Sequence, residues 1–342
     1  MEKGVSVILC CYNSAKLLPE TLEQICIQKV NPQINWEIII INNSSTDDTV
    51  HVAETLLRNK SPVAYRILDE KNPGLSNARK KGIENSEYEY IIFCDDDNHL
   101  HQDYINNSFE IMSNNERIGI AGGYSEAVSN AKFPSWFHEF SQNFSIGKQS
   151  EVNGDITGLN TVLWGAGMVI RTSAAKQLYA NGFKSLLTDR IRGELSSGGD
   201  SEFCYALKLS GYKIFYDEKL KLRHYMPDFR LNWNYLRKLS RAFGAQKVYF
   251  EPYIKELNKR NSSGFKENHW IKESIRLLKK LRYYGLKKLI NLNKFPEGDP
   301  EVLRIDKTAG RLKEILKLKS RYNDNFRLLE KAEWLKIQSF ND

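Results

Sequence analysis

Three consecutive carboxylates, Asp95, Asp96 and Asp97, directly follow the apolar run YIIFC. Adjacent carboxylates repel one another, and a bound cation relieves that repulsion. Mg²⁺ or Mn²⁺ is the natural choice, because these ions prefer oxygen ligands and usually share their coordination with substrate phosphates. Side chains alternate along an extended chain, so we expect Asp95 and Asp97 to point to the same side. The alternative is an acidic loop that only caps a helix over Asn98–Met112, which is the commoner case for an isolated DDD.

A further carboxylate, Asp200, stands at the start of a helix pattern in LSSGGDSEFCYAL. The helix dipole favours an ionised carboxylate at this place, and by itself the pattern indicates no more than a helix cap. Glu202 is two residues farther along the helix and should face elsewhere. His224 ends the next strand pattern, GYKIFYDEKLKLRHYMP; a lone histidine is more often structural than a metal ligand.

The first hundred residues alternate strand and helix patterns, and these elements must position the carboxylates. Strands that are apolar on both faces and alternate with helices predict a mostly parallel sheet covered on both sides. Ligands bind beyond the carboxyl ends of such strands, where Tyr12, Asn13, Asn42 and Asn43 stand with the DDD run. Strands are predicted at Val5–Cys11, Trp36–Ile41, Tyr65–Leu68 and Tyr90–Cys94, and helices at Lys16–Gln28, Thr49–Asn59 (capped by Ser45 or Thr46) and Leu75–Asn85.

The rest of the chain divides at about residue 230. The middle part mixes short strands and Gly-rich turns with two helical stretches, Ser173–Ala180 and Asp200–Ser210. From about Leu231 the pattern is helical and basic, with a break near Asn291–Pro300. We therefore expect a catalytic domain at 1–230, made of halves 1–117 and 118–230, and a helical basic tail at 231–342.

Charge is distributed unevenly over the 342 residues, whose formal net charge is +8. Residues 1–230 carry 24 Lys+Arg and 29 Asp+Glu, whereas residues 231–342 carry 26 and 13. The basic part suits an anionic surface: membrane lipid, nucleic acid or a phosphorylated substrate. No apolar run suggests a membrane span or a secretory signal. Because the five cysteines form no CxxC pair, we expect reduced thiols in a cytoplasmic protein.

Four motifs together resemble a known family. VSVILCCYN, EIIIINNSSTDDT, GLSNARKKGI and YIIFCDDDN occur in this order, roughly thirty residues apart, each at a strand end or the following turn. Together they resemble the GT-A fold of family 2 glycosyltransferases, through residue 230. The resemblance implies a Rossmann-like α/β sheet flanked by helices, and an enzyme that moves a sugar from a nucleotide-sugar donor to a hydroxyl.

The resemblance places the donor nucleotide on the first two strands. Cys11, Tyr12 and Asn13 match the segment that holds the base and the ribose. Asn42 and Asn43 stand where the family usually has an acidic pair that contacts the base; of the two, Asn43 is our donor-binding candidate. An amide can still pair with a base, so UDP, GDP and dTDP donors all stay open.

Further donor contacts are implied in three later segments. Arg79, in GLSNARKKGI, matches an arginine near the nucleotide, although a surface charge is an equal alternative. Gly167, in LWGAGMVIR, belongs to a turn that lies under the donor sugar. Arg190 and Arg192 could neutralise the diphosphate or could be surface charges.

The acidic groups receive their roles from the same resemblance. Asp97 is the main ligand of Mn²⁺ or Mg²⁺ and His224 an additional one, while Asp95 and Asp96 contact the donor. The metal would act as a Lewis acid on the departing diphosphate. Asp200 is the general base of an inverting reaction.

The basic tail offers two interpretations. Ile271–Ile290 holds seven Lys/Arg and one Glu, beside an apolar stripe made of Ile271, Ile275, Leu278 and Leu281. Such a helix could lie on an anionic membrane surface, or its stripe could pack on the catalytic domain.

Three functions compete at this stage. The first is a metal-dependent, inverting glycosyltransferase that acts on a glycan or lipid-linked acceptor in surface polysaccharide synthesis, cytoplasmic or peripheral on the inner face of the membrane. The second is a nucleotidyltransferase, but CCYNSAKLL lacks the glycines of its phosphate loop. The third is a nucleic-acid-binding protein that uses the tail; the acidic cleft side argues against it, so we expect no nucleic-acid partner.

Overall fold

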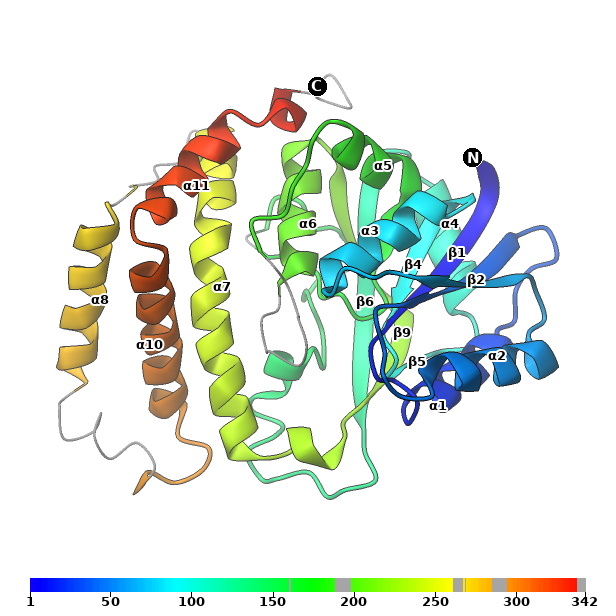
Figure 1. Ribbon diagram of the computed structural model, residues 1–342, viewed down its shortest axis with the longest axis horizontal. Coiled ribbons are helices and arrows are strands. Elements are labelled where there is room, and N and C mark those ends of the chain that lie inside the picture. Colours follow the sequence, from blue (N-terminus) through cyan, green and yellow to red (C-terminus); the bar gives the residue numbers. More distant parts are fainter. Residues whose placement is uncertain (160, 188–197, 261–266, 268, 285–293, 337–342) are drawn as a thin grey trace.

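The computed structural model describes residues 1–342 apart from 160, 188–197, 261–266, 268, 285–293 and 337–342, and Figure 1 shows a twisted sheet with helices on both faces and a layer of long helices beside it. The strands are β1 (Glu2–Cys11), β2 (Asn35–Asn42), β3 (Tyr65–Asp69), β4 (Tyr88–Cys94), β5 (Asn98–Leu100), β6 (Ile118–Val128), β7 (Gly154–Asp155), β8 (Val169–Arg171) and β9 (Lys213–Tyr225). The helices are α1 (Leu18–Cys26), α2 (Thr49–Lys60), α3 (Leu75–Asn85), α4 (Tyr104–Ser113), α5 (Thr172–Ala180), α6 (Gly199–Leu209), α7 (Trp233–Arg260), α8 (Trp270–Tyr283), α10 (Pro300–Leu318) and α11 (Ser320–Glu330).

The sheet follows the order β3-β2-β1-β4-β8-β6-β9-β5, and β7 pairs with β9. β1 to β4 pair in parallel, as the apolar strand patterns predict. β8, β5 and β7 run antiparallel to their neighbours, so the sheet as a whole is mixed. Both faces of β1 are buried, with Val7 and Ile8 fully inaccessible, because helices cover the sheet on either side.

Two local predictions are wrong. The helix over Asn98–Met112, which belonged to the alternative interpretation of the acidic run, is divided into β5 and α4, because Asn98 pairs with His224 of β9 instead of entering a helix. The expected cap of α2 is also different: neither Ser45 nor Thr46 caps the helix, and Asp47 accepts a hydrogen bond from the Thr49 N–H (3.1 Å).

The helical part of the chain shares its core with the sheet. Tyr253 and Trp334 belong to the same cluster of buried side chains as Ile8 and Phe203. α7 and α10 pack backbone to backbone, because a Cβ atom on Gly310 would lie 2.0 Å from the Arg241 carbonyl oxygen. α8 and α11 lie outside this pair (Figure 1).

The predicted apolar stripe of α8 is split. Leu281 packs against a buried cluster formed with α7 and α10, whereas Ile271, Ile275 and Leu278 are exposed. The stripe as a whole therefore does not pack on the catalytic domain. In the part of the chain that the structure describes, no helix combines the length and the hydropathy needed to cross a membrane.

Candidate active site

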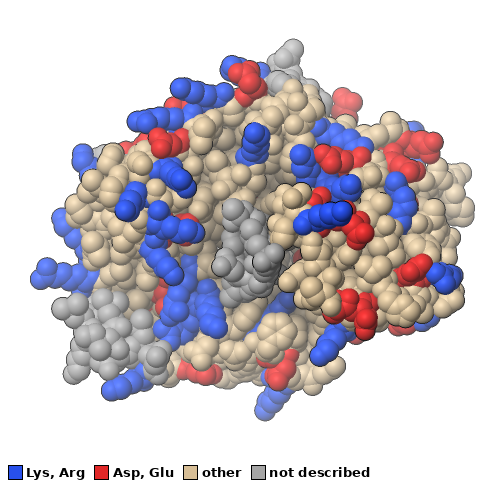
Figure 2. Space-filling view, in the orientation of Figure 1, with Lys and Arg blue, Asp and Glu red and all other residues tan. Residues whose placement is uncertain are grey.

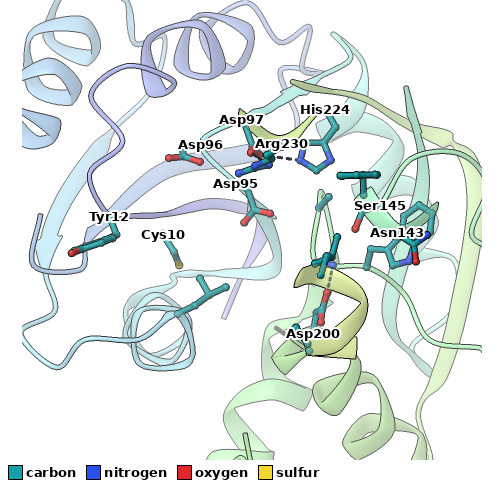
Figure 3. Close-up of a pocket in the computed structure, with 18 of the residues that line it drawn as sticks. Cys10, Tyr12, Asp95, Asp96, Asp97, Asn143, Ser145, Asp200, His224 and Arg230 are labelled. Carbon is teal, nitrogen blue, oxygen red and sulfur yellow. Dashed lines mark hydrogen bonds and ion pairs between the residues drawn. The ribbon is translucent and has the colours of Figure 1, made fainter. Parts of the chain in front are cut away.

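A cleft of about 1730 Å³ opens between the carboxyl ends of β1 and β4 on one side and α7 on the other. It gathers most of the site residues that the sequence predicts, and Figure 3 shows several of them around one cavity. The predicted residues that line it are Cys11, Tyr12, Asn13, Asn43, Arg79, Asp95, Asp96, Asp97, Asp200 and His224. Gly167 does not line the cleft.

The three aspartates form a turn and not a strand end. β4 ends at Cys94, and the Asn98 N–H donates to the Asp95 carbonyl oxygen (3.0 Å). The alternation of an extended chain therefore does not apply, and Figure 3 shows Asp97 directed toward His224 and Arg230 while Asp95 points elsewhere. Burial, followed by the charge of Asp97, raises the pKa of Asp96 to about 7.

Asp97 is the most heavily engaged of the three, with only 3% of its surface exposed. Its Oδ2 accepts a hydrogen bond from Arg230 Nη1 (2.7 Å), and its Oδ1 lies 3.3 Å from His224 Nε2. The pairing of Asn98 with His224 across β5 and β9 brings this histidine to the acidic turn. Burial works to lower the pKa of Arg230, but Asp97, with smaller contributions from Tyr235 and Asp96, raises it overall.

Arg230 is a site residue that the sequence analysis missed. It lies in the short 3₁₀ helix Asp228–Arg230, at the residue where the predicted catalytic domain ends. No local pattern marks it, because its partner is 133 residues away in the chain.

The donor atoms at Asp97 and His224 fit a divalent cation such as Mn²⁺ or Mg²⁺. A carboxylate oxygen and an imidazole nitrogen face each other, and these ions leave several positions for phosphate oxygens and water. Across the described residues, no set of three or more His, Cys, Asp and Glu side chains is gathered in a way that could hold a metal. A site built on these two ligands therefore needs oxygens from the substrate, and the cation must share Asp97 with Arg230 or replace it.

The first strand ends in a segment held by the loop after β2. Asn13 has a left-handed backbone (φ 54°), and its Oδ1 accepts a hydrogen bond from the Thr46 N–H (2.8 Å). Tyr12 is exposed at the cleft, where its ring is available to a planar ligand. Cys11 is fully buried, and burial raises the pKa of its thiol well above the usual range.

Asn43 uses its side chain to hold a loop. Its Nδ2 donates to the carbonyl oxygens of Glu70 (3.0 Å) and Asn72 (2.8 Å), and its Oδ1 accepts from the Gly74 N–H (2.8 Å). Both amide protons are therefore already used. In this structure Asn43 positions the loop that leads into α3 and Arg79.

Asp200 lies in the first turn of α6, on the other side of the cleft from Asp97 (Figure 3). Its two oxygens accept hydrogen bonds from the Gly165 N–H (2.6 Å) and the Ser201 N–H (2.8 Å). A Cβ atom on Gly165 would lie 2.6 Å from Arg79 Nη2 and 3.2 Å from Asp200 Oδ2. Gly165 thus lets Arg79 and Asp200 approach the same point, which places Arg79 beside the candidate base.

Two further residues that the sequence analysis considered, Glu202 and Gly167, form contacts outside the cleft. Glu202 is buried behind Asp200, where it accepts hydrogen bonds from the Tyr253 hydroxyl (2.7 Å), the Leu186 N–H (2.6 Å) and the Ser185 hydroxyl. It faces away from the reaction side, as its helical position predicts. Gly167 has φ 68° and packs against Tyr104, whose hydroxyl donates to the Gly167 carbonyl oxygen (2.5 Å). Arg190 and Arg192 lie outside the described residues.

The far wall of the cleft is basic and partly aromatic. Lys238 and Arg241 of α7, Lys317 of α10 and the exposed ring of Phe229 line it. In Figure 2, Lys and Arg outnumber Asp and Glu over the part of the view where α7, α8 and α10 lie in Figure 1. The basic composition of residues 231–342 signals this charge, but it does not show that α7 lines the cleft.

Comparison with known proteins gives one family model and several relatives. The model described as "Glycosyl transferase family 2" matches residues 6–179. Glycosyltransferase GlyA of Streptococcus pneumoniae serotype 4 is 30% identical over 141 residues, which are 40% of this chain and 19% of that protein. The poly-beta-1,6-N-acetyl-D-glucosamine synthase of Staphylococcus aureus (strain COL) is 30% identical over 122 residues, 35% of this chain and 28% of that protein. The chain thus spans less than a third of these relatives.

Solved structures share the fold over nearly the whole chain. S. aureus TarS 1–349 in complex with UDP has a TM-score of 0.51 at 17% identity, covering 99% of this chain and 93% of that one. The mannosyltransferase PcManGT of Pyrobaculum calidifontis, in complex with GDP-Man and Mn²⁺, has a TM-score of 0.57 at 13% identity, covering 93% and 87%. The expected fold class is confirmed, including the long helices after residue 230.

Proposed function

Because this chain belongs to glycosyl transferase family 2, we propose that its cleft transfers a sugar from a nucleotide-sugar to an acceptor hydroxyl with inversion. The observation that carries this proposal is the placement of two carboxylates across one cavity. Asp97, with His224 and Arg230, lines one side of the cavity, where the diphosphate leaves in this proposal, and Asp200 lines the other side (Figure 3). Asp200 takes the proton of the acceptor hydroxyl while that oxygen attacks the anomeric carbon from the side opposite the leaving group.

The donor occupies the rim formed by β1, β2 and β4 in this proposal. Tyr12 and Asn13 contact the base and ribose, Asp95 and Asp96 the ribose side, and Arg79 the sugar side next to Asp200. Complexes of TarS with UDP and UDP-GlcNAc, and of the mannosyltransferase with GDP-Man and Mn²⁺, support a nucleotide-sugar donor. Asp97 and His224 would hold Mn²⁺ or Mg²⁺, which supplies Lewis-acid stabilisation of the leaving diphosphate.

The acceptor approaches along α7. Its wall pairs the exposed aromatic Phe229 with the cations Lys238 and Lys317, an arrangement that suits a sugar carrying a phosphate group. We propose a glycan or lipid-linked acceptor in surface polysaccharide synthesis, reached from the cytoplasmic face of the membrane. In this proposal residues 1–230 supply the reacting groups, and the helices after 230 supply the acceptor wall.

The proposal is tested by donor turnover. The full chain is incubated with UDP-, GDP- and dTDP-sugars and Mn²⁺, and nucleoside diphosphate release is measured with and without EDTA. We expect release from one class of donor, its loss in EDTA, and its loss in Asp97→Ala but not in Asp103→Ala, an exposed aspartate outside the cleft. Release that persists in EDTA contradicts the metal assignment. No release from any donor, in a chain that is folded by circular dichroism, contradicts the proposed function.

A further inference from the structure

α8 presents three of its aliphatic side chains to solvent, whereas Leu277, Leu281 and its single acidic side chain face the protein interior. Ile271, Ile275 and Leu278 are 46%, 47% and 52% exposed, and their spacing of four and three residues places them on one face of the helix. Glu273, only 2% exposed, points inward and pairs with Arg276 (2.5 Å) and Arg311 (2.6 Å). Single exposed aliphatic residues are ordinary on protein surfaces. Three on one face of a helix that also buries its only carboxylate indicate an interaction surface.

The charged side chains around this row are all positive. α8 carries five cations and one carboxylate, and that carboxylate is buried and paired, so the outer surface of the helix is basic. Lys272 lies three residues before Ile275 and Lys279 four residues after it, so both are neighbours of this residue on the helix surface and border the row. The cations are Lys272, Arg276, Lys279, Lys280 and Arg282.

The basic surface continues onto neighbouring helices. Burial lowers the pKa of Lys307 of α10, and the nearby positive charges of Lys247 of α7 and Lys280 of α8 lower it further. Like charges brought together in this way favour an anionic partner, which would relieve their repulsion. Tyr283, at the end of α8, is almost fully exposed and is of the residue type enriched at membrane–water interfaces.

We propose that α8 docks the protein on an anionic lipid surface. The row Ile271–Ile275–Leu278 enters the boundary between headgroups and acyl chains, and the flanking lysines contact acidic headgroups. The charge of this face selects the occupant, because a neutral or basic partner would leave the cations of α8 uncompensated. The purpose of the docking, access to a lipid-linked acceptor, rests on the proposed function; the binding itself does not.

The test is co-sedimentation of the full chain with vesicles of two compositions: phosphatidylcholine mixed with phosphatidylglycerol, and phosphatidylcholine alone. We expect binding to the first and at least about tenfold weaker binding to the second, because each cation near an anionic surface contributes to attachment. Replacing the row with serine (I271S/I275S/L278S) should weaken partitioning about a hundredfold by removing the inserted aliphatic groups. Lys272→Glu with Lys279→Glu should abolish the preference for the acidic lipid.

Matched controls separate docking from general stickiness and from catalysis. Ile27→Ser and Arg58→Glu change an exposed aliphatic residue and an exposed cation on the sheet side, and binding should stay as in the wild type. Nucleoside diphosphate release in detergent-free buffer should be unchanged in the serine variant, which shows that its fold and cleft are intact. The proposal is overturned if the chain binds both kinds of vesicle equally, or if the control substitutions weaken vesicle binding as much as the serine variant does. It is also overturned if sedimentation velocity shows a dimer of the wild type that is absent in the serine variant. Vesicle binding without any donor turnover would contradict only the proposed function.

Discussion

Two backbone N–H groups, those of Gly165 and Ser201, donate hydrogen bonds to the carboxylate of Asp200 and hold it in place. Both donors fix the direction of its carboxylate, which a general base needs before a hydroxyl arrives. The absence of a side chain at Gly165 lets Arg79 lie against the same carboxylate. In the proposed reaction, these contacts set the direction from which Asp200 approaches the acceptor hydroxyl.

Asp200→Asn should abolish sugar transfer and leave donor binding intact. The amide keeps the size of the side chain but cannot take a proton, so we expect transfer to fall by about 10²–10⁴-fold. Transfer is measured by nucleoside diphosphate release with acceptor, and donor affinity by calorimetry. Ser201→Ala is the control, because it keeps the backbone N–H that Asp200 uses. Normal transfer in Asp200→Asn rules out its role as the base.

Arg230→Gln should strengthen the binding of Mn²⁺ to the protein without nucleotide. Arg230 competes for Asp97 Oδ2, and a charge-assisted bond of this kind corresponds to about tenfold or more in affinity. Manganese binding is followed by electron paramagnetic resonance. Arg241→Gln is the matched control, since its partner is Asp306. Weaker Mn²⁺ binding in Arg230→Gln would mean that the arginine supports the cation instead of competing with it.

At the scale of elements, Glu202 joins α6 to α7 and to the segment before residue 188. Its carboxylate accepts hydrogen bonds from Tyr253 of α7 and from Ser185 and Leu186. These contacts fix the position of the first turn of α6, and therefore the position of Asp200 in the cleft. A buried carboxylate with this many donors is a structural junction.

Glu202→Ala should lower the free energy of unfolding by about 3 kcal/mol, because it leaves several buried donors without an acceptor. Urea denaturation followed by fluorescence measures the change. Glu54→Ala serves as the control: Glu54 forms an exposed ion pair with Arg58, and its loss should change stability by less than about 1 kcal/mol. Equal effects of the two substitutions would contradict the junction role.

The same carboxylate predicts a pH dependence. Burial raises the pKa of Glu202 above its ordinary 4.5, so the folded chain keeps this proton at pH values where the unfolded chain has lost it. The contribution of Glu202 to stability therefore falls as the pH rises from about 4.5 to its folded pKa, and is constant outside that window. Glu202→Gln, which has no proton to lose, should reduce the slope of stability against pH there. An unchanged slope, from urea midpoints at several pH values, would contradict this assignment.

At the scale of the whole molecule, the sheet and the C-terminal helices share a buried core. Tyr253, Leu329 and Trp334 belong to the same buried cluster as Ile8 and Phe203. A second cluster joins Trp136 with Trp233 and Val302. The cleft lies between these parts, so the acidic rim at the end of β4 and the basic wall on α7 face each other only when both parts are present.

A chain cut after Arg230 should therefore fail to fold cooperatively. It would expose the apolar surfaces that α7, α10 and α11 cover, and we expect no sharp thermal transition by circular dichroism. In the full chain, Trp334→Ala should already lower the free energy of unfolding by about 3 kcal/mol through the cavity it leaves. A cut chain that melts as sharply as the full one would show that residues 1–230 form an independent domain.

Sequence patterns alone determined the sheet of the first hundred residues. Long apolar runs such as Trp36–Ile41 are buried on both faces, and only a covered parallel sheet satisfies them, so β1 to β4 and α1 to α3 were predictable to within a few residues. The same rule placed Tyr12, Asn43 and Asp97 at one edge, because parallel strands end together.

Only the tertiary structure decided which groups meet across the cleft. The contact of Asp97 with His224 and Arg230 depends on the pairing of β5 with β9 and on a short helix far along the chain, and no local pattern contains that distance. The sequence did predict the aliphatic row of α8, but it did not show that this row faces solvent. Periodicity shows that one face of a helix is apolar, but whether that face turns inward depends on its neighbours, and here buried Glu273 is bound to Arg311 of α10.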